Sequence, residues 1–275
     1  MDASLVRMPA VAGRFYPSHP DELAKAIDRY LSPEAAHEEV LTDAKGCLAP
    51  HAGYMYSGHV AGAVYRRLPL SKSFVILCPN HSGRGEPLAI MTRGAWRTPL
   101  GDAPVDAELA GLIRRHCEFL VEDETAHAQE HSLEVQLPFL QRRMKSFSFV
   151  PIALGGVAFE TLVTLGRLLA GALREFAKPA FVIASSDMNH YEPDEVTRAK
   201  DHHAIREILM LDAKGLYDTV LREKITMCGY GAAVVALTAI KSLGASQANL
   251  VKYATSANTG GDTRSVVGYA GIVIH

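Results

Sequence analysis

A short apolar run at residues 73–79 ends abruptly in a proline, an amide and an imidazole, Pro79-Asn80-His81. Continuous apolar runs of this length that are rich in β-branched residues are typical of parallel strands covered on both faces. Ligands of open α/β sheets bind just beyond the carboxyl ends of such strands. The pattern therefore predicts a buried strand with His81 at a ligand-binding edge.

The same pattern occurs twice more. Residues 46–50 run into His51, and residues 180–184 run into a polar segment that contains His190. If the three runs are parallel strands of one sheet, their carboxyl ends lie along one edge. We therefore expect His51, His81 and His190 to line one pocket.

Strand-like and helix-like patterns alternate along the rest of the chain. Apolar spacing predicts helices at about 18–31, 58–67, 106–117, 159–176, 194–211, 214–222 and 227–243. Further strands are predicted at 88–91, 147–154, 249–255 and 265–274.

Between these elements, residues 32–44 read as a polar connection and residues 95–102 as turn-rich, and Pro138 argues against one unbroken helix through 133–140. The chain shows no internal repeat and no convincing linker. We therefore expect a single domain over 1–275, of the α/β class, built as a three-layer α/β/α sandwich around a mixed, mainly parallel central sheet.

The composition and charge of the chain indicate which kinds of partner it is expected to bind. Hydrophobic residues make up 48% of the chain and charged residues 21%, and the net charge is −2 without a basic cluster. Nucleic acid and membrane surfaces are therefore not expected as partners. No apolar stretch approaches the roughly 20 residues that span a bilayer. Residues 1–4 do not resemble a signal peptide, and the four cysteines form no C-x-x-C pair, so we expect a reducing, cytoplasmic setting.

The strand-end histidines suit metal binding, because neutral imidazole is a good ligand for iron, copper and zinc. Taken singly, His51 and His81 fit hydrogen-bonding surface groups as well, and both interpretations remain open at this point. Cys228 stands just before a predicted helix, a position that lowers a thiol pKa, but it also fits a small buried residue at a turn.

The segment His127-Ala128-Gln129-Glu130-His131 fits the H-x-x-E-H pattern of inverted zinc peptidases. That function requires one helix with both histidines on the same face and Glu130 as general base. The flanking residues are polar and Pro138 follows, which counts against such a helix. A zinc hydrolase that uses His127, Glu130 and His131 is therefore the less favoured alternative.

Two further pairs of residues allow two interpretations each. Asp187 and His190 stand three residues apart, so Asp187 either orients His190 as a base or caps the helix that follows. Tyr54 and Tyr56 either line a pocket or pack in the core. Glycine motifs for nucleotide phosphates are absent, and nucleotide binding is not indicated.

Several motifs, in order, carry a resemblance to a known family. They are 9–17, Ala49-Pro50-His51-Ala52-Gly53-Tyr54, Pro79-Asn80-His81, Thr98-Pro99-Leu100-Gly101-Asp102, Glu130-His131-Ser132-Leu133-Glu134, Ser185-Ser186-Asp187, Met227-Cys228-Gly229 and Val266-Val267-Gly268-Tyr269. Together they resemble the Memo family, also called AmmeMemoRadiSam system protein B, over nearly the whole chain. The Memo fold is similar to that of class III, LigB-type extradiol dioxygenases, which are non-haem iron enzymes.

This resemblance implies that His51, His81 and Cys228 are metal ligands. It also implies that His190, in the acid–base position, and His131 lie beside the metal. We therefore expect three catalytic residues to line the metal pocket: His190, Asp187 and His131. The dioxygenases hold iron with two histidines and a carboxylate, and Cys228 stands here in place of that carboxylate. A thiolate is softer and oxidisable, so the departure argues against plain dioxygenase activity. We expect iron(II), with copper or zinc as alternatives.

Two classes of function follow from the resemblance. One is a metal-dependent oxidoreductase related to the extradiol dioxygenases, acting on an unknown small molecule. The other is a binding module that receives a peptide or protein in the former enzyme pocket, since animal members are associated with phosphotyrosine peptides. Prokaryotic members accompany a radical-SAM protein and an AMMECR-type protein, which are the expected functional partners.

Overall fold

The computed structural model describes residues 5–32 and 40–275. Residues 1–4, where no signal peptide is expected, and most of the predicted polar connection lie outside the described residues.

The helices and strands follow the predicted alternation. The helices are α1 (Pro20–Leu31), α2 (Tyr54–Tyr65), α3 (Ala107–His116), α4 (Thr125–Ala128), α5 (His131–Glu134), α6 (Leu137–Arg143), α7 (Phe159–Glu175), α8 (Asp194–Leu209), α9 (Ala213–Arg222), α10 (Tyr230–Ser242) and the short 3-10 helix η1 (Ser256–Thr259). The strands are β1 (Val6–Arg7), β2 (Gly46–Ala49), β3 (Ser73–Pro79), β4 (Leu88–Ile90), β5 (Ala95–Thr98), β6 (Gly101–Pro104), β7 (Val121–Glu122), β8 (Ser148–Leu154), β9 (Ala180–Ser185), β10 (His190–Glu192), β11 (Ala248–Thr255) and β12 (Val266–Ile274).

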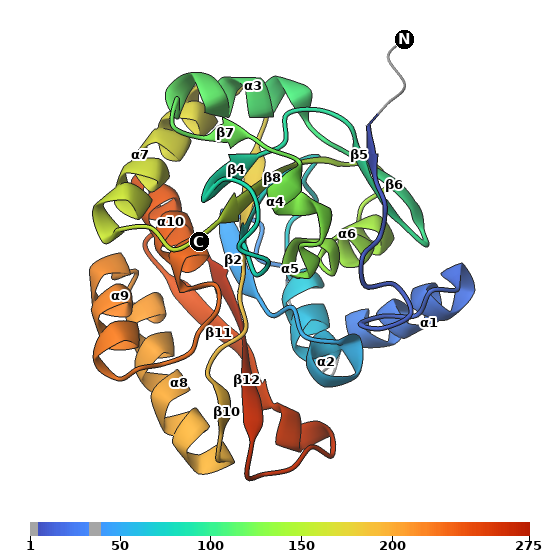
Figure 1. Cartoon of the computed structure of the whole chain (residues 1–275), viewed down its shortest axis with the longest axis vertical. Coiled ribbons are helices and arrows are strands. Elements are labelled where there is room, and N and C mark those ends of the chain that lie inside the picture. Colours follow the sequence, from blue (N-terminus) through green and yellow to red (C-terminus); the bar gives the residue numbers. More distant parts are fainter. Residues whose placement is uncertain (1–4, 33–39) are drawn as a thin grey trace.

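In the described part of the chain, the main sheet has nine strands in the order β10-β12-β2-β9-β3-β8-β4-β7, with β11 paired to β12. The four central strands β2, β9, β3 and β8 run parallel, whereas β12 and β4 pair antiparallel with them. Helices cover both faces: α1, α2 and α4 to α6 on one side, and α3 and α7 to α10 on the other (Figure 1). The predicted three-layer α/β/α sandwich with a mixed sheet is confirmed.

The burial of strand β3 on both faces of the sheet explains its apolar sequence. All its residues are buried. Phe74, Ile76 and Cys78 enter the core cluster under α1, α2 and α6, whereas Val75 and Leu77 enter the cluster under α7 and α10. Successive side chains of a strand point to opposite faces, so a strand covered on both sides is apolar along its length, and the one polar side chain, Ser73 at its start, donates to Asp106.

Helix α2 begins four residues before the predicted start at 58. The glycines in this stretch resemble a loop, but they serve the contact between α1 and α2. A Cβ on Gly62 would lie 2.2 Å from the backbone oxygen of Tyr30, and a Cβ on Gly58 would lie 2.6 Å from its ring. The missing side chains therefore allow two helices to approach closely, and α2 starts directly after His51.

The segment 95–102, predicted as turn-rich, contains the hairpin β5–β6, which joins β1 in a three-stranded sheet. Its strands are too short for alternation to stand out in the sequence. The break predicted at Pro138 is confirmed, since α5 ends at Glu134 and α6 begins at Leu137 with this proline in its first turn.

A bilayer span requires a long helix of apolar composition, and no helix within 5–32 and 40–275 meets both conditions. The cytoplasmic setting and the single domain stay predictions. For the site, the important feature of the fold is that β2 and β3 both lie beside β9 and run parallel to it.

Candidate metal centre

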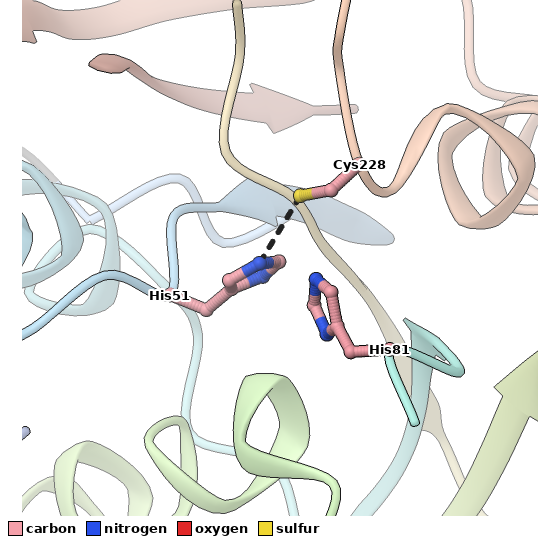
Figure 2. A group of neighbouring side chains, drawn as sticks. All are labelled: His51, His81 and Cys228. Carbon is pink, nitrogen blue, oxygen red and sulfur yellow. Dashed lines mark hydrogen bonds between the residues drawn. The ribbon is translucent and has the colours of Figure 1, made fainter. Parts of the chain in front are cut away.

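The sheet brings the strand-end residues together. His51 is the second residue after β2, His81 is the second residue after β3, and both strands pair in parallel with β9. Cys228 approaches from the segment that precedes α10. One ligand atom from each of His51, His81 and Cys228 lies within 4.8 Å of the others, and Figure 2 shows the sulfur turned toward the two rings. The predicted gathering of these side chains is confirmed.

The spacing of these atoms suits a metal ion. His51 Nε2 lies 3.1 Å from Cys228 Sγ. The rings of His51 and His81 stand nearly perpendicular, at 84°, with centroids 5.2 Å apart. Metal bonds of about 2.0–2.3 Å to nitrogen and sulfur place neighbouring ligand atoms roughly 3–4 Å apart. The described residues therefore fit a mononuclear centre.

The tautomer of His51 follows from a count of hydrogens around Ser185. The Ser185 hydroxyl donates its one hydrogen to the backbone oxygen of Ser132, at 2.7 Å, and accepts from Gln136 Nε2 at 2.8 Å. His51 Nδ1 lies 3.0 Å from the same oxygen and must donate to it, because a hydroxyl has one hydrogen. With Nδ1 protonated, Nε2 carries the lone pair that faces Cys228. Burial, followed by the charge of His81, lowers the pKa of His51 well below its usual value, so this ring stays neutral.

His81 is held by a buried carboxylate. Glu130 Oε1 accepts from His81 Nδ1 at 2.9 Å, and Oε2 accepts from the His81 backbone N–H at 2.7 Å. Ser132 donates to Oε1 from both its backbone N–H and its hydroxyl. Burial raises the pKa of Glu130, but the hydrogen bonds from His81 and Ser132 outweigh it and bring the pKa to about 2. The ionised carboxylate only accepts, so His81 Nδ1 donates and Nε2 remains for a ligand.

Asp187 supports the backbone at His51. Its buried carboxylate accepts from the N–H of His51 at 2.7 Å and from the N–H of Ala52 at 3.3 Å. Pro193, not Asp187, precedes the first residue of α8, so the interpretation as a helix cap is wrong. None of the described hydrogen bonds joins Asp187 to His190, and that pairing stays a prediction.

His131 and His190 lie beside the cluster and line the same pocket. The His131 ring stacks on His81 with centroids 4.5 Å apart, and burial, followed by the charge of His51, lowers its pKa to about 4. The Nδ1 atom of His190 is buried and has no hydrogen-bond partner within the described structure, while its backbone N–H donates to Thr226 Oγ1. The structure thus places both residues where the sequence predicted them, and their chemical roles stay predictions.

His127 does not belong to this cluster. Helix α4 ends at Ala128 and α5 begins at His131, so no single helix carries the H-x-x-E-H residues. The buried His127 ring donates from Nδ1 to the backbone oxygen of Asp123 and packs against Trp96. The geometry that the zinc hydrolase requires is therefore absent from the described residues, because Glu130 turns to His81 instead.

Comparison with known proteins identifies the family of this chain. A family model described as Memo-like protein matches residues 7–273. The chain belongs to the Memo family. A MEMO1 family protein from Methanosarcina mazei is 45% identical over 272 residues, which cover 98% of this chain and 99% of the relative. Another from Methanopyrus kandleri is 43% identical over 277 residues, covering 97% and 98%, and one from Pyrobaculum aerophilum is 45% identical over 278 residues, covering 98% and 99%.

The pocket of this Memo-family chain has a volume of about 790 Å³. Aromatic rings form much of its wall: Phe15, Tyr56, Tyr191 and Tyr269. Tyr56 therefore lines the pocket, whereas Tyr54 is buried in the core and donates its hydroxyl hydrogen to the backbone oxygen of Val135. Among the described residues, the pocket lining contains no lysine or arginine.

The thiol of the Memo cluster differs from its prediction. Burial, followed by the charge of Asp187, raises the pKa of Cys228 in the protein without a cation, whereas a position before a helix predicts a lowered value. Helix α10 begins two residues later, and desolvation outweighs its dipole. A coordinated cation reverses this balance, because a thiol that binds a metal is deprotonated.

Sequence reasoning missed the residues that orient His51 and His81. It assigns Glu130 only as the base of a hydrolase, and it gives no role to Ser132, Gln136 or Ser185. Glu130 and Ser132 stand in one resemblance motif and Ser185 in another, which is the one signal that marks them. Gln136 carries no signal in a single sequence.

Proposed function

We propose that this Memo-family protein is a non-haem metalloprotein that holds one iron(II) ion with His51, His81 and Cys228 and uses it for redox chemistry on a small molecule. One observation carries the proposal. Both imidazoles donate from Nδ1 to buried acceptors, which leaves both Nε2 atoms beside a cysteine sulfur. Metal-binding histidines are oriented by acceptors of this kind.

The choice of metal rests on the donor set. Two imidazoles and a thiolate suit iron, copper or zinc. The resemblance to LigB-type dioxygenases favours iron(II), while the soft sulfur makes copper(I) the first alternative and zinc the second. When bound, the ion would supply Lewis acidity and, for iron or copper, electron transfer.

The surrounding residues support proton transfer. His190 presents an unpartnered, buried Nδ1 at the pocket wall, and we assign it the role of moving a proton to or from the substrate. His131 is neutral near pH 7, since its pKa is about 4, and it accepts a hydrogen bond from a substrate in this interpretation. Asp187 fixes the backbone that carries His51.

The alternative function as a phosphopeptide-binding module gains less support. Phosphate recognition commonly uses arginine clusters, and the described pocket lining has neither arginine nor lysine. A radical-SAM protein and an AMMECR-type protein remain the proposed functional partners, on the resemblance alone.

Metal content tests the proposal directly. We expect near-stoichiometric iron, measured by plasma mass spectrometry, in protein purified anaerobically without chelator or affinity metal. His51→Ala, His81→Ala and Cys228→Ala should each lose it, because each removes a ligand atom, whereas His190→Ala should retain it. His116→Ala, which changes a partly exposed histidine of α3, is the matched control.

Circular dichroism of each variant separates lost ligation from lost folding. Retention of metal in all three ligand variants would contradict the proposal. So would a wild-type protein that neither contains metal nor rebinds iron(II). Loss of metal in His190→Ala would place His190 among the ligands.

A further inference from the structure

A second, smaller pocket also reaches the metal centre. Its volume is about 290 Å³, and of the residues that line the larger pocket it shares only His81 and Cys228. The remaining lining comes from the ends of β3 and β8, the segment 155–157, α7 and the first residues of α10. The two pockets therefore meet at the same two ligand residues.

The two linings differ in chemistry. Leu154, Val157, Leu162 and Ala232 give the small pocket apolar walls, and its described lining contains no aspartate, glutamate, lysine or arginine. The larger pocket holds three more histidines and two aspartates. This lining favours an uncharged occupant, because a charged group loses hydration there and meets no aspartate, glutamate, lysine or arginine among the described lining residues.

Glycines keep the small pocket open. A Cβ on Gly231 would lie 3.5 Å from Leu162 Cδ2, an ordinary contact with a wall residue, and a Cβ on Gly156 would meet nothing within 4 Å. Of the wall residues, Leu154, Leu162 and Ala232 are buried. A larger side chain at Gly231 therefore fills the pocket without a clash in the surrounding backbone.

We infer that the small pocket is a second binding site at the metal centre, for an uncharged molecule of a few heavy atoms, of the chemical class of dioxygen and other diatomic gases. This inference rests on the proposed metal centre at His81 and Cys228. In this inference the small pocket holds a second reactant next to His81 and Cys228, while the larger pocket holds the substrate.

Xenon binding tests this site without any metal. Xenon is a chemically inert probe of small apolar cavities. In metal-free protein with labelled methyl groups, xenon pressure should shift the NMR signals of Leu154, Val157 and Leu162. Gly231→Leu should weaken xenon binding, measured by these shifts, about tenfold, because the added side chain occupies the space that xenon fills. Gly231→Ala should give a smaller decrease.

The matched control is Gly111→Leu, which adds the same side chain to α3, where a Cβ meets only Arg115 at 3.9 Å. It should leave the xenon shifts unchanged. No xenon shift at the three wall residues, or full shifts in Gly231→Leu, would overturn the inference. Because no metal is needed, this outcome is independent of whether the metal-content experiment succeeds.

The connection between the small pocket and Cys228 has its own readout. Cys228 is the one cysteine that is not fully buried, so alkylation of the native metal-free protein reports on it. Gly231→Leu should slow labelling by the small neutral reagent iodoacetamide about threefold or more, and leave labelling by the bulky fluorescein maleimide nearly unchanged. An unchanged iodoacetamide rate, or an equal loss with both reagents, would overturn the connection.

Discussion

His51 and His81 present the same atom to Cys228, yet the two sides of the candidate metal centre are built differently. On the β2 side, His51 is 2% exposed and donates to a neutral hydroxyl within a buried network of Ser185, Gln136 and Ser132. On the β3 side, the His81 side chain is 32% exposed and donates to the ionised Glu130. One ring is held mainly by packing and the other by a charge-assisted hydrogen bond.

The difference follows from burial. A buried ring has few orientations, so a neutral acceptor is enough to fix its tautomer. A partly exposed ring competes with water and needs the stronger hydrogen bond of a carboxylate, which is roughly twice as strong as a neutral one. A carboxylate also raises the basicity of the ligand it holds. The comparison therefore assigns more of the metal affinity to Glu130 than to Ser185.

The largest expected effect comes from Glu130→Gln. The amide keeps the shape of the side chain but turns an N–H₂ group toward donors of His81 or Ser132, so His81 loses its anchor. We expect iron(II) affinity to fall roughly 10–100-fold. An anaerobic titration against a chromophoric chelator measures it. Glu175→Gln, in an exposed pair with His116 at 2.8 Å, is the control and should leave the affinity unchanged.

A smaller effect is expected for Ser185→Ala. His51 Nδ1 and Gln136 Nε2 both lose an acceptor, but packing still holds the ring, so iron(II) affinity should fall by about tenfold or less. Ser242→Ala, which removes an exposed hydroxyl from α10, is the matched control. An affinity loss larger than that of Glu130→Gln would reverse the comparison between the two sides.

The last prediction concerns the stability of the protein in acid rather than its metal affinity. The pKa of His131 is lowered to about 4 by burial and by the charge of His51, so the unfolded chain binds this proton more readily than the folded protein does. The contribution of His131 to stability is therefore complete above its unfolded pKa of about 6.5 and is lost as the pH falls toward 4. Glu130, with its pKa of about 2, stays ionised throughout this window.

Urea unfolding of the metal-free protein measures this contribution. Between pH 7 and pH 4, the free energy of unfolding of the wild type should fall by roughly 2–3 kcal/mol more than that of His131→Gln. Asp201 acts in the opposite direction, because burial raises its pKa to about 7, and it is present in both proteins. An equal loss in both proteins would contradict the prediction.

The histidines are predictable from the sequence because their signal is local. Each buried strand shows as an uninterrupted apolar run, and the polar residue that ends the run marks the carboxyl edge. The apolar runs alone therefore predict that His51, His81 and His190 lie together. Cys228 is identified through the family resemblance, since its own surroundings fit a buried structural residue equally well.

The start of α2 is less predictable for a physical reason. Residues 54–57 lie between Gly53 and Gly58 and resemble a loop in the sequence, and Gly58 and Gly62 are poor helix formers. Their role is visible only from Tyr30, which occupies the space that their side chains would fill. A contact between helices, rather than local propensity, decides where α2 begins.

The sequence by itself determined the alternation of strands and helices, the α/β class and the three strand-end histidines, because these depend on periodicity and on short-range chemistry. Only the tertiary structure decided what orients the ligands. Glu130 meets His81 across 49 residues of sequence, and Ser185 meets His51 across 134. Such hydrogen bonds depend on strand order, which local patterns do not encode. The order β2-β9-β3 is what sets Ser185 beside His51 and brings both histidines to Cys228.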